Sequence, residues 1–174
     1  PEVPKGTARR ELLLRYADLV ESLHGTYCTA CDMNTTPEDM DVIGERCRSV
    51  FGRTEAAGGS GSSAPSTALG VYHGIRAAVW FAFGDDALEG RTVLIQGVGA
   101  VGRILAEALA SDGARLIVSD IDDVRARGTA DAVGADVVSA ADAITTECDV
   151  LSPCATGGVL SAATIPRLRC RIVA

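Results

Sequence analysis

The chain has 174 residues, of which 47% are hydrophobic, and its formal net charge is −7. This length suits one domain, or one domain with part of another, and the composition can supply a buried core. The negative charge disfavours nucleic acids and anionic membranes as partners, and no apolar run reaches the roughly 18 residues of a membrane span. Six cysteines without a short secreted pattern indicate reduced thiols and a cytoplasmic protein.

The first fifty residues contain two predicted helices and one predicted strand. Apolar residues at helical spacing predict a helix over 7–23, and residues 26–31 are typical of a strand. Thr36 followed by Pro37 then predicts the start of a second helix, because threonine is a good N-cap and proline suits the first helical position.

The rest of the chain alternates between predicted helices and strands. A Gly-, Ser- and Ala-rich segment over 53–65 predicts a loop or a crossover between domains, and a long helix follows from Ser66 to Phe83. Strands are then expected near 92–96, 115–119, 136–139, 148–152 and 170–174, and helices near 101–112, 122–133, 140–146 and 161–167. Such alternation predicts an α/β fold with a doubly wound parallel sheet and helices on both faces.

The motif Gly97-x-Gly99-x-x-Gly102 stands between a buried strand and a helix, which is the context of a dinucleotide-binding turn. Gly97 permits the tight turn, Gly99 lets a pyrophosphate approach the backbone, and Gly102 allows the helix to pack closely on the strand. The amides of the first helical turn and the helix dipole attract phosphate. A glycine-rich turn without a ligand is the simpler alternative.

Asp120 ends the next predicted strand, eighteen residues after Gly102. An acidic side chain at this place in a dinucleotide-binding unit receives the ribose hydroxyls. The sequence therefore predicts that Asp120 binds the ribose of a dinucleotide.

Residues 152–158 follow a later strand of the same unit, and ligands of open α/β sheets bind beyond the carboxyl ends of strands. We expect this loop to contact the nicotinamide half of a dinucleotide. A nucleophilic role for Cys154 is conceivable, but no histidine lies nearby in the sequence to act as its base.

Asp32 follows the predicted strand over 26–31, so its carboxylate is expected to face a cleft between two domains. An aspartate that only caps a turn is an equal alternative. Cys28 and Cys31 have the spacing of metal and redox sites, yet no histidine or second pair completes a metal site. We therefore expect two small buried side chains there and no metal site.

Several motifs, in order and with family spacing, resemble the NAD-dependent amino-acid dehydrogenases, which include the leucine, valine, phenylalanine and glutamate dehydrogenases. The motifs are Gly25-Thr-Tyr-x-Thr-Ala-x-Asp32, Thr35-Thr-x-x-Asp39-Met40-Asp41, Thr67-Ala-x-Gly70-Val71-Tyr72, Gln96-Gly-Val-Gly99 and Cys148-Asp-Val-Leu-x-Pro153-Cys154-Ala-x-Gly157-Gly158. The resemblance covers nearly the whole chain and is far more specific than the glycine motif alone.

The resemblance implies oxidative deamination of an apolar L-amino acid to a 2-oxo acid and ammonia, with NAD as the cofactor. Asp32 would be the catalytic aspartate that shares proton transfer with a lysine, and Asp120 would favour NAD over NADP. The residues expected to bind NAD are Thr67, Gly97, Gly99, Ala100, Val101, Gly102, Asp120, Ile121, Cys154, Ala155 and Thr156.

The resemblance also implies two domains: residues 1–50 as the C-terminal part of a substrate and catalytic domain, and 51–174 as a Rossmann-like NAD-binding domain truncated at its last strand. The lysine-rich motif of the family is absent, and Lys5 does not replace it. We therefore expect a fragment of a longer enzyme that forms a homo-oligomer. The alternative is a non-catalytic NAD-binding module, and leucine, valine and phenylalanine all remain candidate substrates.

Overall fold

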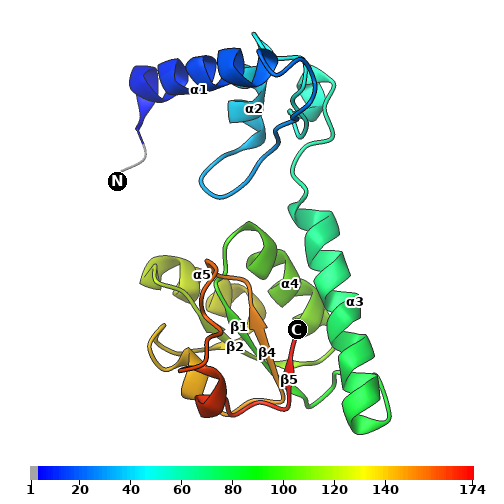
Figure 1. Ribbon diagram of the computed structural model, residues 1–174. Coiled ribbons are helices and arrows are strands. Elements are labelled where there is room, and N and C mark those ends of the chain that lie inside the picture. Colours follow the sequence, from blue (N-terminus) through cyan, green and yellow to red (C-terminus); the bar gives the residue numbers. More distant parts are fainter. Residues whose placement is uncertain (1–3) are drawn as a thin grey trace. The chain divides into compact units, whose positions relative to one another are not determined.

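The computed structural model describes residues 4–174 and divides the chain into two compact units, Pro1–Ser63 and Ala64–Ala174 (Figure 1). The division lies thirteen residues after the boundary expected at residue 50. The additional residues belong with the first unit because Phe51 N–H donates to the Thr29 carbonyl at 2.8 Å. In addition, the Thr54 hydroxyl donates to the Asp41 carboxylate at 2.7 Å.

The first unit is built on two helices, α1 (Gly6–Glu21) and α2 (Pro37–Gly44), with a short 3-10 helix, η1 (Glu55–Ala57). Its small core consists of buried apolar side chains from both helices and the following turn: Ala17, Val20, Met40, Ile43 and Cys47. The helix expected from Thr36 is confirmed. Thr36 caps α2, and Asp39 completes a capping box by accepting from the Thr36 N–H at 2.9 Å.

The strand expected over 26–31 is reduced to a single parallel bridge between Thr29 and Val50. Among the described residues of this unit, the segment around Val50 is the only one that pairs with it. Cys28 is exposed and Cys31 is half-buried, so the expectation of two buried side chains is wrong for Cys28.

The second unit contains a five-stranded parallel sheet in the order β3-β2-β1-β4-β5. Its elements in chain order are α3 (Ala64–Phe83), β1 (Thr92–Gln96), α4 (Ala100–Ser111), β2 (Arg115–Ser119), α5 (Asp123–Val133), β3 (Asp136–Val137), η2 (Ala143–Thr145), β4 (Val150–Pro153), η3 (Ile165–Arg167) and β5 (Ile172–Val173). The predicted parallel α/β sheet is confirmed. Chain order reverses at β1, whose neighbours are β2 and β4.

Alternate side chains of β1 enter two separate cores, as expected for a strand buried on both faces. Val93 and Ile95 belong to the core formed with α3, α4 and α5. Leu94 belongs to a second core with Leu151, η2 and the segments on either side of η3.

The helices expected over 140–146 and 161–167 are instead the 3-10 helices η2 and η3, so in residues 4–174 the α-helices cover one face of the sheet. Side chains that bond to nearby backbone compete with the α-helix here. Thr145 and Thr146 both donate to the Asp142 carbonyl, and Thr164 donates to the Val159 carbonyl at 2.7 Å. Pro166 further limits the second segment.

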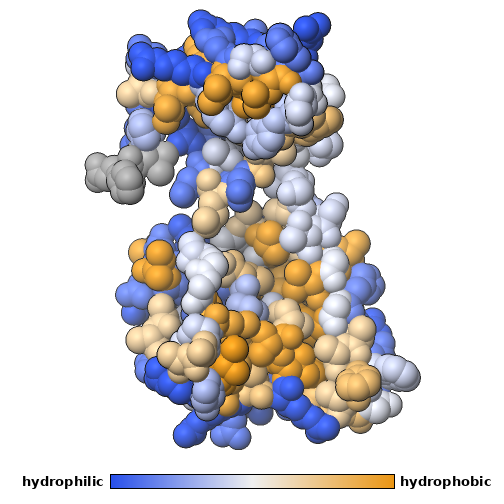
Figure 2. Space-filling model, in the orientation of Figure 1, coloured by the Kyte–Doolittle hydropathy of each residue, from blue (hydrophilic) through white to orange (hydrophobic). Residues whose placement is uncertain are grey.

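Figure 2 shows hydrophobic side chains over the second unit near β4 and β5. Val173 of the edge strand β5 is 42% exposed. Among the described residues, no helix is both long and apolar enough to span a membrane.

Candidate functional site

The candidate site is the turn between β1 and α4 together with the loops that follow β2 and β4. Gly97 has φ +93°, and its N–H donates to the Ser119 carbonyl at 2.7 Å. A Cβ on Gly97 would lie 2.7 Å from the Ala155 nitrogen, and one on Gly102 would lie 2.0 Å from the Gly97 carbonyl oxygen. Glycine is therefore required at both positions by contacts with backbone, and at Gly97 also by the left-handed φ.

Gly99 differs from these two glycines because a Cβ there would meet no atom within 4 Å. Gly99 is the N-cap of α4, and no side chain caps this helix end. Ala100 and Val101 lie in the first turn of α4, where backbone N–H groups have no partner within the helix. Open space beside an uncapped helix N-terminus matches the needs of a phosphate group.

Asp120 follows β2, and its side chain is only 5% exposed. Its Oδ2 accepts from the Val98 N–H at 2.9 Å, and its Oδ1 accepts from the Asp122 N–H at 2.9 Å. The Asp120 carboxylate therefore ties the glycine turn to the loop after β2. Each oxygen accepts one of these hydrogen bonds and retains capacity for another donor.

Sequence reasoning missed two features around Asp120. The backbone N–H of Val98 is its partner across the turn, and the guanidinium of Arg125 lies 3.5 Å from Asp120 and 3.4 Å from Asp122. Arg125 is five residues after Asp120 on α5, so helical spacing could have suggested this pairing. Ile121, in contrast, is 91% exposed and free of core contacts.

Two buried polar atoms at the carboxyl ends of β1 and β2 make no hydrogen bond within residues 4–174: the Gln96 Oε1 and the Ser119 Oγ. Gln96 and Ser119 are partners in the β1–β2 register. Gln96 begins one of the motifs quoted above, but the sequence assigned no role to its side chain, and Ser119 lies in none of those motifs. Unpartnered buried polar atoms of this kind invite a water molecule or a ligand group.

The loop after β4 approaches the glycine turn directly. Cys154 N–H donates to the Gln96 carbonyl at 2.8 Å, and Ala155 is the residue that a Cβ on Gly97 would strike. Ala155 and Thr156 are exposed. Burial raises the pKa of the Cys154 thiol, which lies 3.6 Å from the Ser152 hydroxyl, and this disfavours a thiolate nucleophile.

Thr67 lies in the first turn of α3 and is exposed. The next residue, Ala68, packs in the same core as Val98 of the glycine turn. The structure therefore places the start of α3 and the glycine turn on one continuous core, within the same unit.

Asp32 belongs to the first unit and is exposed. Its Oδ1 accepts from the Met33 N–H at 2.7 Å, and its own N–H donates to the Thr35 hydroxyl at 2.8 Å. Asn34 adopts a left-handed conformation with φ +61° within this turn. Asp32 thus stabilises a tight turn and leaves most of its carboxylate accessible.

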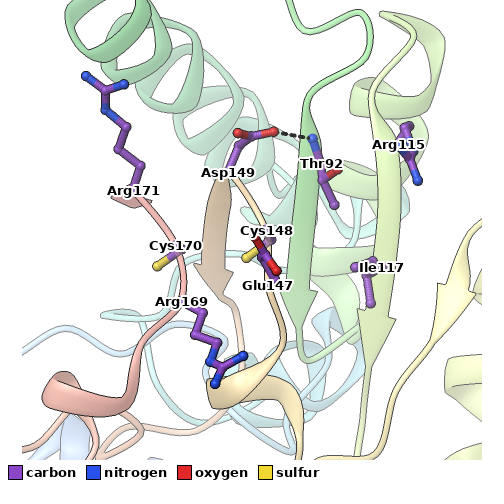
Figure 3. A pocket seen from close by; sticks show the side chains of 9 residues that line it. All are labelled: Thr92, Arg115, Ile117, Glu147, Cys148, Asp149, Arg169, Cys170 and Arg171. Atoms are coloured by element: carbon purple, nitrogen blue, oxygen red, sulfur yellow. Dashed lines mark hydrogen bonds between the residues drawn. The ribbon is translucent and has the colours of Figure 1, made fainter.

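A hollow of ≈ 750 Å³ lies at the amino ends of the strands, opposite to the carboxyl ends that the glycine turn follows (Figure 3). Its lining includes Thr92 at the start of β1 and Arg115 at the start of β2. This hollow is therefore separate from the glycine turn. Within the described residues, no group of His, Cys, Asp and Glu side chains could hold a metal ion.

The sequence profile of the Glutamate/Leucine/Phenylalanine/Valine dehydrogenase family matches residues 58–125. A leucine dehydrogenase from Thermoactinomyces intermedius is 44% identical over 174 residues, which are 100% of this chain and 47% of the relative. The chain is thus similar to this family's profile in its middle part and to a leucine dehydrogenase over its whole length.

Two further amino-acid dehydrogenases are similar to the chain. A valine dehydrogenase from Streptomyces coelicolor is 42% identical over 98% of this chain and 48% of its own length. The L-tryptophan dehydrogenase from Nostoc punctiforme superposes with a TM-score of 0.69 at 35% identity, over 94% of this chain and 46% of that structure. The chain thus spans about half the length of the relatives it matches.

Proposed function

We propose that this chain is part of an NAD-dependent dehydrogenase that oxidatively deaminates an apolar L-amino acid to a 2-oxo acid and ammonia. The second unit would be its Rossmann-like NAD-binding domain, and the first would be a portion of its substrate and catalytic domain. The observation that carries the proposal is the glycine turn, with open space at Gly99 and the Asp120 carboxylate beside it. The family relationship adds the reaction class.

The residues of the second unit fit NAD. The uncapped N-terminus of α4 would hold the pyrophosphate through backbone amides, and Gly99 leaves it room. Asp120 would accept hydrogen bonds from the ribose hydroxyls and would repel the 2′-phosphate of NADP. Thr67 and residues 154–156 would contact the nicotinamide end, and Ile121 would line the adenosine end.

NAD would supply the hydride acceptor, and this chain would position it and handle one of the protons. Asp32 is exposed and ionisable, so its carboxylate would take up a proton from the substrate ammonium or from water and return it later. The lysine with which family members share this proton transfer is not among the 174 residues.

The relatives named for leucine, valine and tryptophan support an apolar substrate and do not single out one amino acid. Assembly into a homo-oligomer and a cytoplasmic location remain predictions. A non-catalytic NAD-binding module is the second candidate function, because the glycine turn and Asp120 serve binding without any chemistry.

The binding part of the proposal is tested by titrating the 174-residue chain with NAD and with NADP, using calorimetry. We expect weak binding of NAD and still weaker binding of NADP. Asp120→Asn should weaken NAD by about 1.5–3 kcal/mol, the value of a hydrogen bond to a charged group. Asp120 also anchors Val98, so the informative quantity is the ratio of the two affinities, which should shift towards NADP.

Asp123→Asn is the matched control, since it removes the same charge three residues away in the first turn of α5. It should leave both affinities nearly unchanged. Equal affinities for NAD and NADP in the unaltered chain would remove Asp120 from its proposed role.

The catalytic part of the proposal needs the gene product at the length of its relatives. Reduction of NAD should be measured with leucine, valine, phenylalanine and glutamate as substrates. Turnover of one of the three apolar amino acids above glutamate supports the dehydrogenase. NAD binding without turnover of any amino acid would favour the non-catalytic module.

A further inference from the structure

The amino ends of β4 and β5 carry two cysteines that neither the glycine turn nor Asp32 involves. Val150 of β4 pairs with Ile172 of β5, and Cys148 and Cys170 each lie two residues before one of these partners, in the segments that lead into the two strands. The Cys148 N–H donates to the carbonyl of Arg169, the residue before Cys170, at 3.2 Å. Figure 3 shows the two cysteines on the neighbouring segments that lead into these strands.

Both side chains pack against the same apolar cluster around Leu94 and Leu151, and both line the hollow at this edge of the sheet. Neighbouring strands lie about 4.7–4.9 Å apart. That spacing falls within the range of about 4.4–6.8 Å between Cα atoms that a disulfide requires. Both thiols are free and half-buried in this structure, so a small reagent can reach them through the hollow.

We propose that Cys148 and Cys170 form a reversible disulfide when the protein meets a low-molecular-weight disulfide such as oxidised glutathione. The Cys170 thiolate attacks the glutathione disulfide, forms a mixed disulfide and releases one glutathione thiolate. The Cys148 thiolate then attacks the Cys170 sulfur and releases the second glutathione. The protein loses two hydrogen atoms and the reagent gains them as two thiols.

The order of attack follows from the surroundings of the thiols. Burial, the largest cause, and the neighbouring Cys170 together raise the pKa of Cys148 to about 12. Burial also raises the pKa of Cys170, but a hydrogen bond from Cys148 acts in the opposite direction. Cys170 therefore ionises first, and the reaction is slow at neutral pH because the thiolate is the attacking species.

The bond would close a ring over residues 148–170, and this ring contains the loop 154–156 that touches the glycine turn. A closed ring restricts the unfolded chain and stabilises the folded one. Oxidation should therefore raise the unfolding midpoint of the second unit. Fluorescence of Trp80, the single tryptophan of the chain, reports on this unit.

The test treats the folded 174-residue chain with oxidised glutathione at pH 7 and pH 9 and maps disulfides by mass spectrometry after digestion. We expect a Cys148–Cys170 link that forms about tenfold faster for each pH unit, in proportion to the thiolate fraction. Dithiothreitol should reverse it. Cys154→Ser, the matched control within the same ring, should form the link as the unaltered chain does.

Cys148→Ser and Cys170→Ser should each abolish the link, and circular dichroism establishes that these variants remain folded. Cys28 is exposed and should take up glutathione in every variant, which shows that the reagent is active. The proposal is overturned if Cys28 reacts while Cys148 and Cys170 stay unlinked at pH 9. It is equally overturned if the link forms only after the chain is unfolded in urea.

Discussion

Ion pairs occur within both units of this chain, but the units differ in how large an apolar core each one has. In the second unit, the central strand β1 places Val93, Leu94 and Ile95 entirely out of contact with solvent. In the first unit, five buried side chains make up the core. Ion pairs connect its segments: Arg9–Asp39, Arg10–Glu45, Arg46–Asp18, Arg48–Glu21 and Arg53–Asp41.

Because of this difference, we expect the two units to respond differently to salt and to pH. Apolar burial does not depend on protonation, whereas exposed ion pairs weaken with salt and with titration of the carboxylates. Most of these pairs are exposed and contribute little, but the carboxylate of Asp39 is only 10% exposed. We therefore expect the second unit, which contains the glycine turn, to be the less sensitive to salt and pH, and the first unit, which contains Asp32, to be the more easily perturbed.

The largest expected effect concerns function and lies in the first unit. In the full-length protein, Asp32→Asn should lower kcat by about 10²–10⁴, the usual contribution of a positioned proton-transfer group. Asparagine can still accept from the Met33 N–H, so the turn and the unfolding temperature should persist. Steady-state kinetics and thermal unfolding measure the two quantities.

Glu11→Gln, an exposed change of the same kind on α1, should leave kcat unaltered. If Asp32→Asn retains activity while its unfolding temperature drops, then Asp32 serves only as a turn cap.

The next largest effect concerns the apolar core of the second unit. Leu94→Ala removes a fully buried side chain from the second core and should lower the free energy of unfolding of the second unit by about 2–5 kcal/mol. Val124→Ala, at a side chain that is 82% exposed, should change it by less than about 0.5 kcal/mol. Urea titrations followed by Trp80 fluorescence compare them, and equal effects would refute a core centred on β1.

The sequence predicted the elements of the second unit better than those of the first. The strands β1, β2 and β4 were predictable from their apolar residues, and the helices α3, α4 and α5 lie where the sequence predicted helices. Each of these elements is buried against its neighbours in the second unit. The segment over 26–31 is also typical of a strand, but within residues 4–174 its one bridge is the pairing of Thr29 with Val50. Strand pairing depends on a partner, which a local pattern does not reveal.

The candidate site was predictable where it depends on glycine and only partly where it depends on polar contacts. Gly97 and Gly102 follow from a motif whose steric reason is backbone contact. The bond between Asp120 and the Val98 N–H joins residues 22 positions apart and involves the backbone of an apolar residue. The unpartnered side chains of Gln96 and Ser119 could not be predicted, because each residue has the sequence context of an ordinary strand end.

A third prediction sharpens the contrast through pH. The hydrogen bond from Arg9 holds the pKa of Asp39 below its usual value. A lowered folded pKa means that this stabilisation is fully present above the ordinary carboxyl pKa of about 4. It is lost as the pH falls through the lower folded value. Asp41 and Glu45 have pKa values shifted in the same direction.

Arg9→Met should therefore destabilise the first unit by about 1.5–3 kcal/mol at pH 7, because it leaves a buried carboxylate without its charged partner. The difference from the unaltered chain should shrink as the pH falls from about 4 through the lower folded pKa of Asp39, at which its carboxylate becomes protonated. Two-dimensional NMR during urea titration resolves the two units. A penalty that is constant from pH 7 to pH 3 would show that Arg9 acts by packing alone.

The smallest expected effect is a change in the stability of the second unit through a surface position of α5. Gly128 is exposed in the interior of this helix, and a Cβ there would meet no atom within 4 Å. Gly128→Ala should stabilise the second unit by about 0.5–1 kcal/mol, because alanine loses less backbone entropy on folding.

Gly134, six residues later, ends the same helix with φ +70° and is also free of close neighbours. Gly134→Ala should destabilise by about 1–2 kcal/mol, since the left-handed conformation disfavours any side chain. Trp80 fluorescence during urea titration measures both variants, and the opposite signs are the prediction. If both substitutions destabilise the unit, then backbone conformation does not set the effect at Gly128, and the exposed face of α5 contributes to stability as well as the two buried cores.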